Sequence, residues 1–148
     1  MRNILTISIL LFLFGNNTVN AKDSKITTID EALGVICGTD LQIGLSVFGL
    51  RDQGKPKEFQ EKVMNTFKNA RQKRIMQFSI NDAYLHKNLS KKVYAFYRMG
   101  LCYQQMTGRN IPQLLSKEIV SKLNKCQNIS SNKEQYLCAE DVAREYSK

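Results

Sequence analysis

Four cysteines constrain this chain more than any other feature of its sequence. Cys37, Cys102, Cys126 and Cys138 all follow an N-terminal segment that reads as an export signal. In an oxidising compartment an even number of cysteines indicates disulfides, for which the sequence allows three pairings. A zinc site would require closely spaced pairs, whereas 64, 23 and 11 residues separate these cysteines. We therefore predict two disulfides and no metal centre.

The export signal occupies residues 1–21. Arg2 precedes an apolar run over 4–14, and a polar stretch then ends at Ala21. The run is too short for a membrane span, which needs roughly 20 residues. We predict cleavage after Ala21, no stable membrane insertion afterwards, and one mature domain over 22–148. The protein would be periplasmic or secreted: the Asn-rich approach to the cleavage site favours bacteria, while glycosylation tripeptides at Asn88 and Asn128 keep a eukaryotic origin open.

The mature chain carries a large positive charge. Without Arg2 it has 21 basic and 13 acidic residues, so its net charge is 21 − 13 = +8. Such a charge favours solubility and attraction to anionic partners, but it does not determine the fold. In an exported protein, the basic run at 71–74 and the lysine pair at 91–92 indicate a solvated face or a docking surface. We expect an acidic protein or envelope polymer as partner, and no nucleic acid.

Hydrophobic periodicity predicts helices along most of the chain. A capping box at Thr28–Glu31 precedes an apolar stripe at helical spacing. Glycines at 34, 38, 44 and 49 and the alternation over 41–47 would also suit a strand, but no partner strand is evident. The glycines then indicate close helix approach or a break near Gly38. The stripe consists of Leu33, Cys37, Leu41, Leu45 and Phe48.

Later segments repeat the helical pattern. Apolar stripes run over 59–70 and 75–84, and Ser90 can cap a helix that ends near Gly108. Pro112 is expected to open the next helix, and a second capping box at Ser131–Glu134 the last one. The predicted fold is a compact all-α bundle of about five or six helices stapled by two disulfides.

The expected helical layout favours one disulfide pairing. A Cys37–Cys102 bridge would tie the first helix to the fourth and close a long loop. A Cys126–Cys138 bridge would staple the last two helices across a short turn.

A motif order gives a family resemblance. Cys37, thirteen residues, Arg51-Asp-Gln-Gly54, then Asp82-Ala-Tyr84, Ser90 and Cys102 resemble a family of small uncharacterised helical periplasmic proteins of gammaproteobacteria. The match covers about residues 35–105, and Asp52 stands where the family pattern has glutamine. The resemblance implies an all-helical exported fold with a Cys37–Cys102 bridge and implies no activity. Residues 110–148, with their own cysteine pair, then look like a C-terminal helical extension.

Candidate catalytic groups are sparse. His86 is the single histidine and lies in a polar stretch typical of a surface loop. Asp82 is expected to hold the turn before Ser90, and Tyr84 to pack. Glu31 already has a capping role, so its spacing from Asp40 does not indicate a carboxylate pair. We therefore expect a protein that is not an enzyme and has no cofactor.

Aromatic residues surround the predicted helix after Ser90, as in a central helix of a bundle or in a helix that also reaches a contact surface. Tyrosine is enriched in protein contacts because it buries area and keeps a polar tip. We predict a binding protein of the inhibitor, immunity or envelope-adaptor type; the alternative is a carrier of a small apolar ligand, with a pocket lined by Phe67, Phe78, Phe96 and Tyr97. The candidate partner-binding residues are Arg71, Lys73, Arg74, Tyr94, Arg98 and Tyr103.

Overall fold

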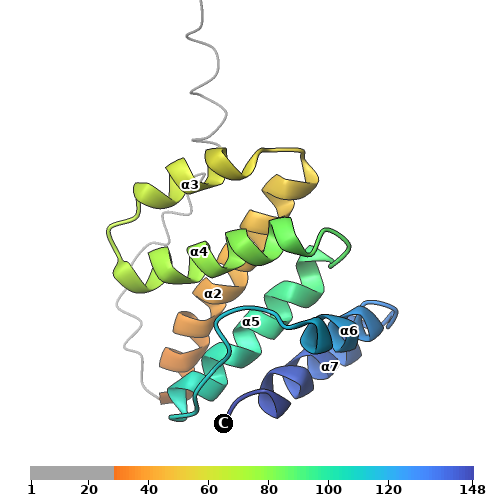
Figure 1. Cartoon of the computed structure of the whole chain (residues 1–148). Helices are drawn as coiled ribbons and strands as arrows, with labels where there is room; N and C mark the ends of the chain where they lie inside the picture. The colour runs from red at the N-terminus through yellow and green to blue at the C-terminus, as the bar shows by residue number, and fades with distance from the viewer. Residues whose placement is uncertain (1–28) are drawn as a thin grey trace, which may run out of the picture.

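The all-α prediction is confirmed. The structure, a computed structural model, describes residues 29–148, and the predicted signal segment and Thr28 lie outside that range. Six helices make up most of the described chain (Figure 1). They are α2 (Ile29–Asp52), α3 (Lys57–Asn65), α4 (Ala70–Leu85), α5 (Lys91–Met106), α6 (Lys117–Cys126) and α7 (Asn132–Glu145).

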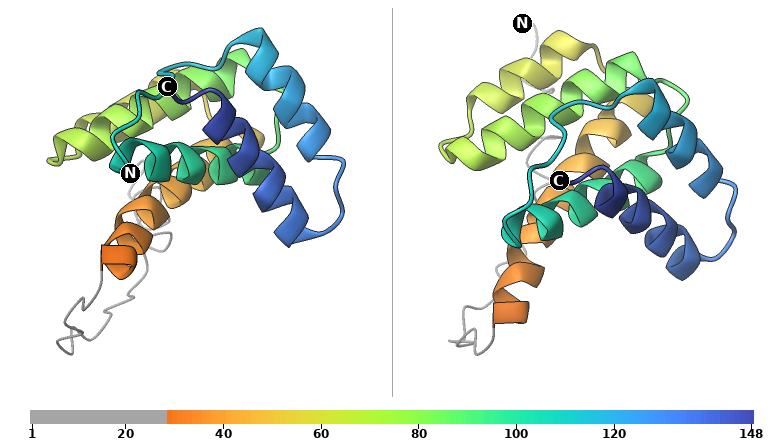
Figure 2. Two further views of the ribbon diagram at one scale, coloured as in Figure 1. Left: turned by 90° about the horizontal axis from the view of Figure 1, so that it is seen from below. Right: turned by 60° about the horizontal axis from the view of Figure 1, so that its bottom comes forward.

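Helix α5 lies at the centre of the bundle. It packs against α2 on one side and α7 on another, while α4 lies across α2 and α3 lies against α4 (Figures 1 and 2). Burial on several sides explains why aromatic and apolar residues surround this helix. Of the two explanations for its many aromatic residues, a central position in the bundle and a contact surface, the structure favours the central position. Its buried residues are Val93, Tyr94, Ala95, Tyr97, Arg98, Gly100, Leu101 and Cys102.

Helix α2 is continuous across its glycines. A Cβ built on Gly44 would lie 3.2 Å from the Cα of Ala95, so this glycine permits close approach of α2 to α5. Close helix approach was one of the two roles expected for the glycines. Gly34 and Gly38 have open space instead, and the helix does not break at Gly38.

By length and composition alone α2 is long and apolar enough to cross a membrane, and a third of its most apolar window is buried inside the protein. One face of α2 packs on α5, to which Cys37 is bonded.

The buried stripe of α2 differs from the predicted one. Cys37 and Phe48 are buried as expected, whereas Leu33, Leu41 and Leu45 are only half-buried. The reason is that α2 packs mainly against two helices, α4 and α5, which together cover a wider face than one stripe. The additional buried positions are Asp40, Ile43, Gly44 and Val47.

Serine caps explain where three helices begin. Ser90 accepts a hydrogen bond from the amide of Val93, and Ser131 accepts one from Glu134, as the sequence predicts. The predicted start at Pro112 is wrong: α6 begins at Lys117, where Ser116 accepts from Ile119. Residues 107–116 form a connection, because the loop must first cross from the end of α5 to α4.

Both predicted disulfides are present. Cys37–Cys102 joins α2 to α5 with a Cα–Cα distance of 5.4 Å, and Cys126–Cys138 joins α6 to α7 with 5.6 Å. The first is buried in the core, whereas Cys138 of the second is half-buried.

The C-terminal segment shares the core of the remaining bundle. Gln127 at the end of α6 accepts a 3.0 Å hydrogen bond from the amide of Ser90, which opens α5. Gln135 of α7 donates to the carbonyl of Cys126 over 3.3 Å. Ile119 and Leu123 belong to the same apolar cluster as Phe48. The described residues therefore pack as one body.

Candidate interaction surface

A polar cluster lies inside the bundle and contains two of the predicted partner-binding residues. Tyr94 is fully buried and stacks on Phe48, with ring centroids 4.1 Å apart. Its hydroxyl donates to Asp82 over 2.9 Å. Arg98 is only 1% exposed, and its guanidinium lies 5.8 Å from the centre of the Phe78 ring. The prediction that Tyr94 and Arg98 meet a partner is wrong, because the bundle covers both.

The same cluster extends to Asp40 and Arg71. Arg71 forms a bidentate ion pair with the buried Asp40, with nitrogen–oxygen distances of 2.6 and 2.8 Å. Its Nη2 also lies 3.4 Å from the Sγ of Cys102. A buried carboxylate requires such a partner. The main role of Arg71 is thus to hold α4 on α2, although its side chain keeps 35% exposure.

Burial dominates the ionisation of this cluster. Burial raises the pKa of Asp82, against the opposing effects of the Leu115 amide, the Tyr94 hydroxyl and the Arg98 charge. Burial likewise raises the pKa of Asp40 against the hydrogen bond and charge of Arg71 and the charge of Arg98. The phenol of Tyr94 also has a raised pKa, chiefly through burial. Tyr94 and Asp82 contact each other, Asp40 contacts Arg71, and the charge of Arg98 acts on the ionisation of Asp40, Asp82 and Tyr94.

Asp82 holds a different segment from the one predicted. Its Oδ1 accepts a 3.1 Å hydrogen bond from the amide of Leu115, in the connection before α6. The turn before Ser90 is held by Arg51 instead. Asp82 therefore joins α4, α5 and the α5–α6 connection at one point.

Arg51 caps the end of α4. Its Nη1 donates to the carbonyls of Ala83 and His86, both at 3.3 Å, and its Nη2 donates to Leu89 over 3.0 Å. Its guanidinium also lies 4.4 Å from the centre of the Phe48 ring. Arginine near a helix C-terminus satisfies carbonyls that have no partner within the helix.

Structural roles account for the residues that carry the family resemblance. Gly54 has φ +75°, which favours glycine, and Ser90 caps α5. Tyr84 does more than pack: its hydroxyl bonds the Lys55 carbonyl and accepts from Gln60 over 2.9 Å. His86 is half-buried at the end of α4, with Nε2 buried and without a protein hydrogen-bond partner among the described residues.

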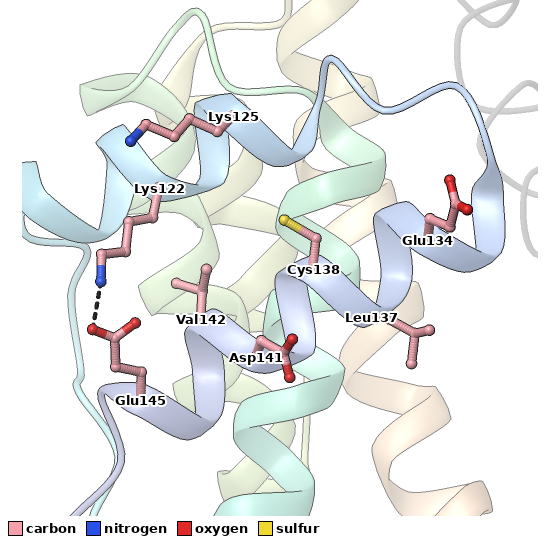
Figure 3. A pocket seen from close by; sticks show the side chains of 8 residues that line it. All are labelled: Lys122, Lys125, Glu134, Leu137, Cys138, Asp141, Val142 and Glu145. Carbon is pink, nitrogen blue, oxygen red and sulfur yellow. Dashed lines mark hydrogen bonds and ion pairs between the residues drawn. The ribbon is translucent and has the colours of Figure 1, made fainter.

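A groove of about 530 Å³ lies on the face formed by α6 and α7 (Figure 3). Lys122 bridges it by pairing with Glu145, and the sulfur of Cys138 lies between the two helices (Figure 3). Basic residues come from α6 and acidic residues from α7, so the charges largely compensate. Its lining comprises Lys122, Lys125, Glu134, Leu137, Cys138, Asp141, Val142 and Glu145.

Three of the four aromatic residues proposed for a ligand pocket pack into the protein, and the fourth, Phe78, is half-buried on α4. Tyr97 is 1% exposed, and Phe67 and Phe96 pack against the apolar core. Phe96 also meets Tyr136 of α7 edge to face, at a centroid distance of 5.5 Å. Because these rings pack against the core and against α7, they do not support the alternative of a ligand carrier whose pocket they would line.

Positive charge is concentrated in one part of the chain. Residues 66–117 contain ten lysines and arginines and one acidic residue, the buried Asp82. Arg98 is buried and Arg71 is paired with Asp40. The other eight have no ion pair within the described part of the chain, and seven are exposed while Lys73 is half-buried. They are Lys68, Lys73, Arg74, Lys87, Lys91, Lys92, Arg109 and Lys117.

The predicted surface residues thus divide into two groups. Arg74 is exposed, and Lys73 and Tyr103 are half-buried, so all three remain accessible to a partner. Arg71, Tyr94 and Arg98 belong to the internal cluster. Sequence reasoning missed Leu85 and Leu114, which are 70% and 52% exposed. For Leu85 a signal existed: it lies nearly opposite Ile80 and Ala83 of the predicted apolar stripe, on the side of Phe78.

Comparison of the chain with known protein families, with curated proteins and with solved structures found no match.

Proposed function

We propose that this chain is an exported, non-enzymatic protein that binds an acidic protein, in the manner of an inhibitor, an immunity protein or an envelope adaptor. The observation that carries the proposal is the distribution of charge. Eight cations that have no ion pair among the described residues lie on α4, on α5, in the adjoining connections and at the first residue of α6, in a segment whose single carboxylate is buried. The positive electrostatic potential that these cations create accelerates encounter with a partner of opposite charge.

The two disulfides support export to an oxidising compartment, where such bonds persist. We infer that this compartment is the periplasm or the exterior, in agreement with the predicted signal at residues 1–21. The family resemblance to periplasmic proteins supports the same placement.

The roles of the polar groups also support a binding protein. Asp82 and Tyr94 are buried against each other, and Arg51 is engaged with backbone carbonyls. These side chains stabilise the fold and so give a rigid scaffold, which lowers the entropic cost of binding.

An affinity experiment tests the proposal. The purified disulfide-bonded protein is immobilised and exposed to the periplasmic or secreted fraction of the cells that produce it. We expect one acidic protein to be retained and to elute as the salt concentration rises, because screening weakens attraction between exposed charges. A matched resin carries Lys73→Glu, Arg74→Glu, Lys91→Glu and Lys92→Glu together and should lose that protein.

Retention of the same proteins by both resins, or of no acidic protein by either, would contradict the proposal. Native mass spectrometry of the purified protein provides the comparison with the alternative function. A bound apolar ligand would favour the carrier.

A further inference from the structure

Two exposed leucines lie on either side of one structural contact. The amide of Leu115 donates to Asp82 over 3.1 Å, which fastens the α5–α6 connection to α4. Leu114 precedes that amide and is 52% exposed, whereas Leu115 is buried. Leu85 lies three residues after Asp82 on α4 and is 70% exposed. The contact therefore places the two leucines on neighbouring segments, because Leu85 lies about one turn after Asp82 and Leu114 adjoins the bonded amide.

Phe78 extends this region along α4. It lies seven residues before Leu85, two helical turns away on the same side, and it is half-buried. The guanidinium of Arg98 lies behind it, 5.8 Å from the ring centre. The ring is thus held in place while part of it faces solvent.

Cations flank the apolar residues. Arg74 is exposed one turn before Phe78, Lys87 follows Leu85 by two residues, and Lys117 follows Leu114 by three. No carboxylate of α4 competes with them at the surface, because Asp82 is buried. An apolar centre with a charged rim is the usual composition of a protein–protein interface.

We infer that Phe78, Leu85 and Leu114, with the surrounding Arg74, Lys87 and Lys117, form the surface that docks the acidic partner; we call these six residues the α4 patch. The inference rests on the proposed function. The positive charge of the patch indicates the kind of partner that binds it: a protein whose surface has an apolar centre surrounded by carboxylates. Of the other exposed large hydrophobics of the described chain, Val35 on α2 and Leu137 on α7 lie outside the basic segment, whereas Met106 lies within it at the C-terminal end of α5.

Site-specific photocrosslinking tests the patch in the full chain. The photoreactive residue p-benzoylphenylalanine replaces Leu85 or Leu114, and in matched controls Val35 or Leu137, which are 63% and 45% exposed. After irradiation of cells that produce the protein, adducts are identified by mass spectrometry. We expect Leu85 and Leu114 to give the same acidic protein, and the two controls to give none of it.

The captured protein is then purified and titrated. Leu85→Ala should weaken its binding by about tenfold or more, the scale of an interface hot spot. Leu137→Ala, the matched control, should change binding by less than about twofold. Both sites are exposed, so thermal melting should show that each variant keeps its fold.

The outcomes separate this inference from the proposed function. An acidic adduct from Val35 or Leu137 but not from the patch would overturn the patch and leave the function standing. Absence of an acidic adduct from all four positions would overturn both. An unchanged affinity of Leu85→Ala would overturn the patch even if crosslinks form there.

Discussion

Tyr94 donates a 2.9 Å hydrogen bond to Asp82, and both residues are buried. The pair joins the two helices α4 and α5 in the interior. Asp82 also accepts from the Leu115 amide, so one carboxylate organises three segments. A charge in such surroundings costs free energy unless it is well compensated.

Replacement of Asp82 by asparagine tests this cost. Burial raises the pKa of Asp82 above its ordinary value of 3.8, so the folded chain binds a proton there more tightly than the unfolded chain does. The contribution of Asp82 to stability is therefore smallest at neutral pH and grows as pH falls through the folded pKa. Asparagine keeps an acceptor for the Leu115 amide and does not titrate.

Denaturant unfolding of both proteins between neutral pH and pH 4 measures the difference. We expect the free energy of unfolding of the native sequence, relative to Asp82→Asn, to rise on acidification. A difference that stays constant with pH would show that Asp82 does not have a raised pKa.

Arg51 should contribute to stability through the end of α4. In Arg51→Ala the carbonyls of Ala83, His86 and Leu89 lose the guanidinium as a donor, and among the described residues only that of His86 keeps a backbone donor, the Leu89 amide. Hydrogen bonds to charged groups contribute about 1.5–3 kcal/mol each, so we expect a loss of at least about 2 kcal/mol, measured by urea unfolding. Lys62→Ala, on an exposed lysine of α3, is the control and should stay within about 0.5 kcal/mol.

Two glycines should respond in opposite directions to alanine. A Cβ on Gly100 would lie 2.9 Å from the Cβ of Ala143 and 3.2 Å from the Cα of Glu140, so α5 and α7 would have to separate. We expect Gly100→Ala to cost about 1–3 kcal/mol. Gly38 has open space in the middle of α2, and Gly38→Ala should stabilise by about 1 kcal/mol.

Thermal melting of both glycine variants checks these signs. If Gly100→Ala melts at the same temperature as the native sequence, the close contact between α5 and α7 is not the constraint that we describe. Destabilisation by Gly38→Ala would show that the outer face of α2 is covered in the protein.

The two disulfides should differ in accessibility and in effect. Cys37 and Cys102 are buried, whereas Cys138 is half-buried and lines the groove between α6 and α7 (Figure 3). Mild reduction followed by alkylation and mass spectrometry should therefore label Cys126 and Cys138 first. Labelling of Cys37 before Cys138 would contradict this order.

The stability lost when each disulfide is removed should increase with the length of the loop that it closes. The bonded cysteines are 65 and 12 residues apart, which corresponds to about 4 and 3 kcal/mol in the chain-entropy description. The pair Cys37→Ser and Cys102→Ser should destabilise the whole bundle. The pair Cys126→Ser and Cys138→Ser should mainly increase hydrogen exchange in α6 and α7.

The sequence by itself determined the fold class, the helix starts at Ser90 and Ser131, and both disulfide pairs. The fold class and the helix starts depend on local signals: a side-chain cap acts within three residues, and hydrophobic periodicity is a property of one helix. The disulfide pairs followed from the expected order of the helices, since Cys37 and Cys102 are 65 residues apart. The end of α3 at Asn65, inside the predicted stripe over 59–70, and the start of α6 at Lys117 were not predicted, since the path of a loop depends on where it must attach. Asp82, which holds the α5–α6 connection, is more than thirty residues away in the sequence.

Only the tertiary structure decided which polar residues face solvent. Arg98 and Arg74 are both arginines within helices, yet one is buried over Phe78 and the other is exposed. The difference arises because α5 is surrounded by α2 and α7, whereas α4 keeps one outer face. Leu85 lies on that face for the same reason. Burial is a property of how helices pack on one another, and the residue type alone does not specify it.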